Sequence, residues 1–139
     1  NVNVSSRKAG ITVLRDETLT LNNELVLIGR NDNLAHDRPT TETLLKQVNT
    51  DLPIILLDHR PTDIEKHASL PLDIQVSGHA HKGQVFPANL ITKMMYRLDY
   101  GHEKIGNPHV FVTSGYGFWG IPMRLGSQSE VIIIDVKGK

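Results

Sequence analysis

The sequence lacks cysteine altogether, which excludes disulfide bonds, thiolate metal ligands and a cysteine nucleophile. This absence is compatible with both the cytosol and an oxidising compartment. No apolar run reaches the roughly 20 residues that span a bilayer, and no signal peptide is visible. An excess of either charge is also missing, because 15 basic residues balance 15 acidic ones. We therefore expect no nucleic-acid-binding surface and no overall attraction to an anionic membrane.

The length of 139 residues suits a single domain with a real core. The chain begins at Asn1 without a methionine, and its first ten residues resemble the middle of a protein more than a beginning. We expect the chain to be a fragment of a longer protein. Neither repeats nor low-complexity segments interrupt it.

The first half alternates β-branched runs with turn residues and then with helical patterns. Leucines and a valine recur at helical spacing after Thr40, and Pro61 and Pro71 bracket a second short helix that starts near Thr62 or Asp63. The runs PIILLDH and LDIQVSG are typical of buried strands. Further strands are predicted at Ile11–Leu14, Thr18–Leu21 and Leu25–Ile28. The helix–strand–helix–strand order over residues 41–77 favours an α/β layout with parallel neighbours.

The second half is less regular. ANLITKMMYRL is read as a short helix or an irregular segment, whereas HVFVTSG and EVIIIDVK are predicted to be strands. Between these two lies YGFWGIPMRLG, whose glycines and aromatics indicate an ordered loop.

Three of the seven histidines follow predicted strands. His59 comes directly after PIILLD, and His79 and His81 come after LDIQVSG. Functional groups of open α/β sheets gather at the carboxyl ends of strands, and adjacent strands lie about 5 Å apart. Imidazole is a common ligand for zinc, iron and other transition metals. The side chains of an extended H-x-H point to one face and can serve one metal or two.

A simpler interpretation stands beside this one, because a lone H-x-H on a surface loop is more often a pair of solvated histidines. Spacing alone leaves the two interpretations balanced. Asp32 and Asp58 are the only acids near predicted strand ends that can add ligands. The other histidines are expected to play no direct catalytic part: His67 as a surface residue of a helix, His36 and His102 in polar loops, and His109 at the start of a strand.

Three segments in order resemble the calcineurin-like metallophosphoesterases: LLDHRP, then SGHAHKGQVFP, then VTSGYGFWGIPMRLGSQSEVIIIDV. The similarity runs from Gly10 onward and points to a bacterial branch. It implies that residues 1–139 are the C-terminal part of such a domain. The implied fold is α/β (α+β), with mixed β-sheets packed as a sandwich between flanking helices. The implied activity is hydrolysis of phosphomonoesters or phosphodiesters by a dinuclear centre of divalent or trivalent Mn, Fe or Zn with a bridging hydroxide.

The resemblance assigns individual roles. His59 and His79 correspond to ligands of the second metal, and His81 to a ligand of the first. Lys82 and Arg124 are candidates for binding the substrate, although a solvated lysine and a structural arginine are the alternatives. Lys82 stands where a small residue is common, and Asp58 stands at a serine-like position.

The earlier family motifs, with an aspartate–histidine pair, a bridging aspartate and an asparagine–histidine pair, are absent. They would lie upstream of Asn1, so the histidine that protonates the leaving group has no candidate here. We expect the chain alone to be inactive, to need the N-terminal half of its domain as a partner, and to self-associate. The other hypothesis is a non-catalytic module that binds a metal or a partner through three histidines. Members of this branch often carry N-terminal membrane helices, so the parent protein is expected at a membrane or otherwise in the cytoplasm.

Overall fold

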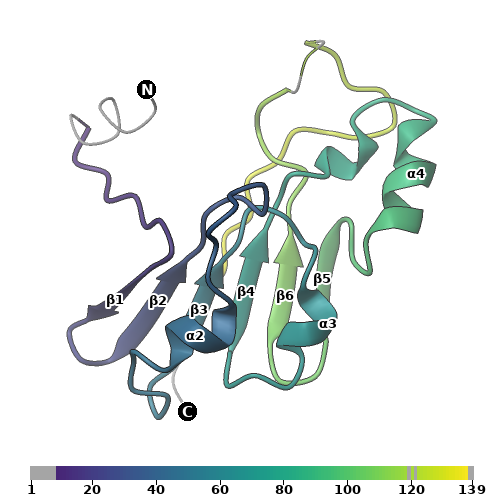
Figure 1. Cartoon of the computed structure of the whole chain (residues 1–139). Helices are drawn as coiled ribbons and strands as arrows, with labels where there is room; N and C mark the ends of the chain where they lie inside the picture. Colours follow the sequence, from purple (N-terminus) through teal and green to yellow (C-terminus); the bar gives the residue numbers. More distant parts are fainter. Residues whose placement is uncertain (1–8, 119, 121, 138–139) are drawn as a thin grey trace.

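The structure, a computed structural model, describes residues 9–118, 120 and 122–137. These residues contain a six-stranded sheet with the strand order β1-β2-β3-β4-β6-β5 (Figure 1). The strands are β1 (Glu17–Leu21), β2 (Leu25–Gly29), β3 (Ile54–Leu57), β4 (Ile74–Ser77), β5 (Gly101–Lys104) and β6 (His109–Val112). The helical elements are α2 (Thr41–Leu45), α3 (Ile64–His67), the 3₁₀ turn η1 (His81–Gly83) and α4 (Ala88–Met95).

The sheet is mixed. Strands β2, β3, β4 and β6 are parallel, whereas β1 and β5 pair antiparallel at the two edges. The β1–β2 connection passes through Asn22 and Asn23, both in the left-handed region at φ 51° and 57°, which asparagine tolerates better than most residues. The α/β class and the mixed sheet are thereby confirmed.

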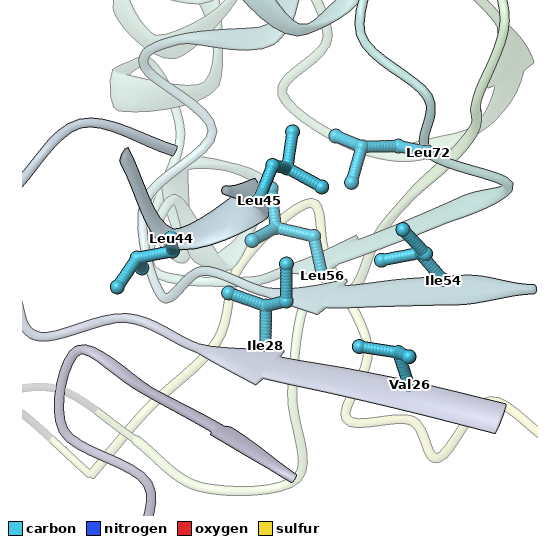
Figure 2. Packing of buried hydrophobic residues seen from close by; sticks show 7 residues of the cluster. All are labelled: Val26, Ile28, Leu44, Leu45, Ile54, Leu56 and Leu72. Atoms are coloured by element: carbon cyan, nitrogen blue, oxygen red, sulfur yellow. The ribbon is translucent and has the colours of Figure 1, made fainter. Parts of the chain in front are cut away.

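The main core lies between the sheet and α2. Val26 and Ile28 of β2 and Ile54 and Leu56 of β3 point to one face, because alternate residues of a strand share a face. Figure 2 shows this layer meeting Leu44 and Leu45 of α2, with Leu72 at the end of the cluster. The Thr40 hydroxyl accepts a hydrogen bond from the Thr43 N–H and so caps the helix, as its threonine start predicts.

The opposite face of the sheet is more open. Leu19, Leu27, Leu57 and Val76 line one side of a hollow there, and none of them is buried. The C-terminal segment passes behind the sheet in Figure 1, and its residues 130–132 and 134 line a second hollow with Val76 and Phe111. The described residues form one sheet, so the sandwich arrangement stays an expectation for a longer protein.

Two predicted strands are not formed. Residues 11–14 are irregular, and the Leu14 side chain instead lies over Gly29, where an added Cβ would meet the Leu14 Cβ at 2.2 Å. EVIIIDVK also forms no strand in its described part, Glu130–Lys137. Conversely, β5 was not predicted, because GHEK has no apolar alternation. His102 therefore lies in a strand rather than a loop, whereas His109 opens β6 as expected.

His67 is buried, contrary to the expectation of a surface residue. Its Nε2 lies 2.8 Å from the Thr41 hydroxyl and its Nδ1 lies 2.9 Å from Gln75 Oε1. The Gln75 Nε2 in turn donates to Ser77 Oγ at 3.2 Å. Because Gln75 Oε1 only accepts, Nδ1 carries the proton and Nε2 accepts from Thr41. His67 is therefore buried although it lies on a helix, because it provides a hydrogen-bond partner for the buried Gln75 amide on β4.

We predict that acid destabilises the fold through His67. Burial is the main cause that lowers the pKa of this histidine. Arg30 also lowers this pKa, whereas Asp58 and Asp63 raise it. As pH falls through about 6.5, the unfolded chain takes up a proton that the folded chain excludes, so the free energy of unfolding decreases. His67→Gln should make this pH dependence shallower and cost roughly 1–3 kcal/mol near neutrality. Urea unfolding across the pH range measures both effects, with His36→Gln in an exposed loop as the control. Equal pH slopes in the wild type and His67→Gln would contradict this account.

We predict that the isolated chain self-associates through the open sheet face, because contiguous exposed apolar surface favours association. Leu19→Lys on the edge strand β1 should shift the chain toward the monomer in size-exclusion chromatography with light scattering. A wild-type chain that is monomeric at every concentration tested would argue against this prediction.

Candidate metal and phosphoester site

The loops that follow β3 and β4 lie side by side at the carboxyl edge of the sheet. The Gly78 N–H donates to the His59 carbonyl at 3.0 Å, and the Asp58 N–H donates to the Val76 carbonyl at 3.1 Å. These two bonds carry the parallel β3–β4 pairing past the ends of the strands. The pairing brings together two histidines that lie 20 residues apart in the sequence.

His59 and His79 face one another directly. His59 Nε2 lies 3.1 Å from His79 Nδ1, and the ring centroids are 5.0 Å apart at an interplanar angle of 77°. Burial lowers the pKa of His79, and the neighbouring Arg60 and His59 lower it further. A lower pKa favours the neutral imidazole, which is the form that binds metals.

His81 is oriented by a backbone carbonyl. Its Nδ1 lies 3.0 Å from the Ser114 carbonyl oxygen, just beyond the end of β6. Arg124 Nη2, which only donates, also lies 3.4 Å from this Nδ1, but the carbonyl oxygen is closer and only accepts, so Nδ1 carries the proton and Nε2 keeps its lone pair. Metal-binding histidines are commonly fixed in this way, through the nitrogen that does not bind the metal.

The backbone of this loop is strained. His79, His81, Lys82 and Gln84 all have positive φ values, of 65°, 47°, 51° and 42°, a region that residues with a side chain rarely occupy. Such strain is tolerated mainly at functional sites, where the surroundings impose it. Gly83, at φ 71°, allows α4 to approach closely, because an added Cβ would lie 2.2 Å from the Asn89 backbone.

Arg124 connects the loop after β6 to the loop after β4, residues 78–84, which we call the histidine loop. Its Nη2 donates to the carbonyl oxygens of Ser114, Gly115 and Gly117 at 2.7, 2.9 and 2.7 Å. Its Nη1 reaches the His81 carbonyl at 3.5 Å. These contacts describe a structural role, and a substrate contact for Arg124 stays a prediction. Trp119 and Ile121 of the same motif lie outside the described residues.

Lys82 points away from the facing histidines. Its Nζ lies 4.1 Å from the centre of the Tyr100 ring, and it lines a polar hollow of about 440 Å³ with Tyr100 and Glu130. The three histidines instead line a hollow of about 660 Å³ with Gly78 and Ser114. The structure thus gives Lys82 an aromatic partner of its own, and its role in substrate binding stays a prediction.

The two acids near the strand ends have arginine partners. Asp32 accepts a hydrogen bond from Arg60 Nε at 2.9 Å, and this bond is the main cause that lowers the Asp32 pKa. Asp58 is buried, pairs with Arg38, and lies 3.5 Å from Arg30. The sequence analysis missed these three arginines. Arg30 and Arg60 lie close to the ends of predicted strands, and Arg38 lies in the polar loop NDNLAHDRP.

Within the described part of the chain, no group of three or more histidine, aspartate or glutamate side chains converges so as to hold a metal. Two histidines face each other and the third is oriented from a neighbouring loop. The other histidines lie elsewhere: His67 beneath the sheet, His36 in an exposed loop, and His102 2.9 Å from His109 on the β5–β6 edge.

The chain is similar to proteins named metallophosphoesterases. It is 37% identical over 140 residues to an uncharacterized metallophosphoesterase of Aquifex aeolicus, and this match covers 96% of the chain and 53% of the relative. It is 35% identical to one of Helicobacter pylori, with 93% of the chain and 36% of the relative covered. A transmembrane protein with metallophosphoesterase domain of Danio rerio is 37% identical over 69% of the chain and 23% of its own length. The chain thus spans about half the length of the first relative and less than half the length of the other two. No family model and no solved structure matches.

We predict that Asp58→Ala strongly destabilises the fold. Asp58 is the buried carboxylate between Arg30 and Arg38, whose side chains are themselves almost fully buried. Its removal leaves the buried Arg38 without its counterion, although Arg30 keeps Asp63 at 3.7 Å, and breaking a buried ion pair typically costs about 3–5 kcal/mol. Asp37→Ala, in the exposed loop, should change stability by less than about 0.5 kcal/mol. Chemical unfolding measures both, and equal stability of the two variants would contradict the assignment.

Proposed function

We propose that this chain, which belongs to the metallophosphoesterase family, supplies three histidine ligands to the dinuclear centre of a metal-dependent phosphoester hydrolase. The observation that carries the proposal is the pair His59 and His79, whose ring nitrogens face each other at 3.1 Å beside a hollow that His81 also lines. The family name supports a hydrolase that uses metal ions, while the dinuclear centre and its ligands are our proposal.

The donor set fits transition metals. His59 and His79 would share one ion, and His81 would present Nε2 to a second. When bound, such a pair of ions polarises the phosphoryl oxygens and activates water for attack. Imidazole accepts Mn, Fe and Zn, so these donors do not select among them. The remaining ligands would come from residues outside this chain.

The chain's own residues orient these donors. The β3–β4 pairing fixes the relative position of His59 and His79. The Ser114 carbonyl fixes His81, and Arg124 holds that carbonyl in place. Arg60, which pairs with Asp32, lines a hollow together with His79 and His81.

A proton donor for the leaving group is not among the residues we assign. The chain spans about half the length of the relative from Aquifex aeolicus. We therefore propose that hydrolysis requires the N-terminal half of the domain as a partner, and that phosphomonoesters or phosphodiesters are the substrates.

A non-catalytic metal-binding or partner-binding module is the second candidate. One observation favours it: Asp32 and Asp58, the described acidic residues at the ends of the strands near the histidines, are paired with arginines. A parent protein that binds metal and hydrolyses no phosphoester would establish this alternative.

We predict that His79→Asn weakens binding of Zn²⁺ to the full-length parent protein at least about tenfold, because the substitution removes one of the ligands that the site needs. His36→Asn, in an exposed loop, is the matched control and should bind as the wild type does. Isothermal titration calorimetry measures both affinities. Equal weakening in the two variants would contradict the assigned ligands.

Catalysis is tested by comparing the isolated chain with the parent protein. The chain alone should not hydrolyse a chromogenic phosphodiester in the presence of Mn²⁺, whereas the parent protein should. Rapid hydrolysis by the isolated chain would show that the ligands expected outside it are not needed.

A further inference from the structure

Glu130 anchors the C-terminal segment to the loop after β6. Its Oε1 accepts a hydrogen bond from the Ser114 N–H at 2.9 Å and another from the Thr113 hydroxyl at 3.1 Å. Its Oε2 accepts from the Tyr100 hydroxyl at 2.9 Å, and its own N–H donates to the Gly115 carbonyl at 3.1 Å. Glu130 therefore holds three consecutive residues of the loop after β6.

The peptide group between Ser114 and Gly115 connects this carboxylate to His81. At one end of the peptide, the Ser114 carbonyl oxygen lies 3.0 Å from His81 Nδ1. At the other end, the Gly115 N–H donates to the Thr113 hydroxyl at 3.0 Å, and that hydroxyl donates to Glu130 Oε1. Imidazole, peptide, hydroxyl and carboxylate thus form one continuous series of hydrogen bonds that ends at Glu130.

The carboxylate sets the direction of this series, because a carboxylate only accepts. The Thr113 hydroxyl gives its single proton to Glu130 and accepts from the Gly115 N–H. The Ser114 carbonyl accepts from His81 Nδ1–H, so every donor points the same way along the series. Hydrogen bonds aligned in this manner polarise and strengthen one another. The series therefore favours the His81 tautomer with the proton on Nδ1 and the lone pair on Nε2.

Arg124 acts on the same carbonyl in the opposite sense. Its Nη2 donates to the Ser114 carbonyl oxygen at 2.7 Å and lies 3.4 Å from His81 Nδ1. Because a guanidinium only donates, it favours a lone pair on Nδ1 and competes with His81 for the oxygen. The tautomer of His81 thus depends on how strongly the Ser114 carbonyl attracts the Nδ1 proton, and Glu130 strengthens that attraction through the peptide.

The charge of Glu130 suits this role. Burial raises the pKa of its carboxyl group, but the hydrogen bonds from Ser114, Tyr100 and Thr113 lower this pKa below its ordinary value. Glu130 is therefore ionised at neutral pH, and hydrogen bonds to an ionised acceptor are roughly twice as strong as those between neutral groups. The sequence analysis placed Glu130 only in the run EVIIIDVK and did not predict its contact with this loop.

We propose that Glu130 is a positioning residue for the proposed metal site, and that it acts through Thr113 and the Ser114–Gly115 peptide to keep the Nε2 lone pair of His81 available. The inference rests on the proposed function for the role of His81 as a ligand, whereas the tautomer of His81 is a property of the metal-free protein. Because His59 and His79 lie outside this series of hydrogen bonds, Glu130 should affect the two proposed ions unequally.

The first test is ¹⁵N NMR of the metal-free parent protein with ¹⁵N-labelled histidine, at a pH of about 8.5, where an ordinary imidazole is neutral. The shifts of the two ring nitrogens report the tautomer, and His81→Asn identifies the signals of His81. We expect the Nδ1–H form in the wild type and a mixture of tautomers in Glu130→Ala. Thr113→Val, which removes only the connecting hydroxyl, should give the same mixture. Circular dichroism checks that each variant is folded.

Three further variants separate this role from a general loss of structure. Glu130→Gln keeps an acceptor oxygen and should retain more of the Nδ1–H form than Glu130→Ala. Tyr100→Phe removes only the bond to Oε2, and Glu103→Ala removes a carboxylate that is hydrogen-bonded to Arg97 on the neighbouring strand. Both should keep the wild-type tautomer. The proposal is overturned if folded Glu130→Ala or Thr113→Val keeps the wild-type tautomer, or if the wild type itself lacks the Nδ1–H form.

The second test measures binding of Mn²⁺ to the parent protein by equilibrium dialysis with elemental analysis. Glu130→Ala should weaken the binding of one ion about tenfold or more and leave the other unchanged, since removing the partner that orients a ligand typically costs 10–100-fold in affinity. The affected ion should be the one that His81→Asn also weakens, and the double variant should show little further loss. His79→Asn should weaken the other ion.

The two tests distinguish a failure of this proposal from a failure of the proposed function. Equal weakening of both ions by Glu130→Ala, or unchanged binding of both, would overturn the positioning role. A parent protein that binds no Mn²⁺ in any form would instead contradict the proposed function, and the tautomer measurement on the metal-free protein would still decide what Glu130 does to His81.

Discussion

The parallel pairing of β3 with β4 is the constraint on which the candidate site depends. Its hydrogen bonds extend past both strands, through the Asp58 and Gly78 N–H groups, and leave His59 and His79 side by side. Parallel strands have their carboxyl ends at one edge of a sheet. The backbone pairing alone therefore brings residues that are distant in sequence close together. The strained backbone from His79 to Gln84 is then held by its surroundings, above all by the Ser114 carbonyl and Arg124.

Polar groups buried beneath the same edge complete this arrangement. Strand β4 alternates its side chains, so Gln75 and Ser77 enter the helix-covered face and join the network of His67 and Thr41, while Val76 faces the open side. Asp58, next to His59, is likewise held between Arg30 and Arg38. Desolvating these groups is costly unless each finds a partner. The pairing of Asp58 with Arg30 and Arg38 offsets part of this cost where the proposed ligands begin.

The sequence predicts some of this fold and misses the rest for identifiable reasons. The strands β2, β3 and β4 follow from apolar runs, the start of α2 from its capping threonine and the start of α3 from Pro61. The facing of His59 and His79 follows from their places after two neighbouring strands. GHEK shows no strand pattern because β5 is an edge strand stabilised mainly by its pairing with β6. EVIIIDVK has strong strand propensity but no partner strand in the described residues, and propensity without pairing is insufficient. The arginine partners of Asp32 and Asp58 depend on tertiary contacts that no local pattern encodes.

In our account the chain contributes half of a metal site, with His59 and His79 on one ion and His81 on the other. The most direct test is anomalous X-ray diffraction from crystals of the full-length parent protein, grown with Mn²⁺ and measured on both sides of the manganese absorption edge. The account predicts two anomalous peaks, one within bonding distance of His59 and His79 and the other within bonding distance of His81. A single peak away from these imidazoles, or two peaks ligated by other residues alone, would contradict it.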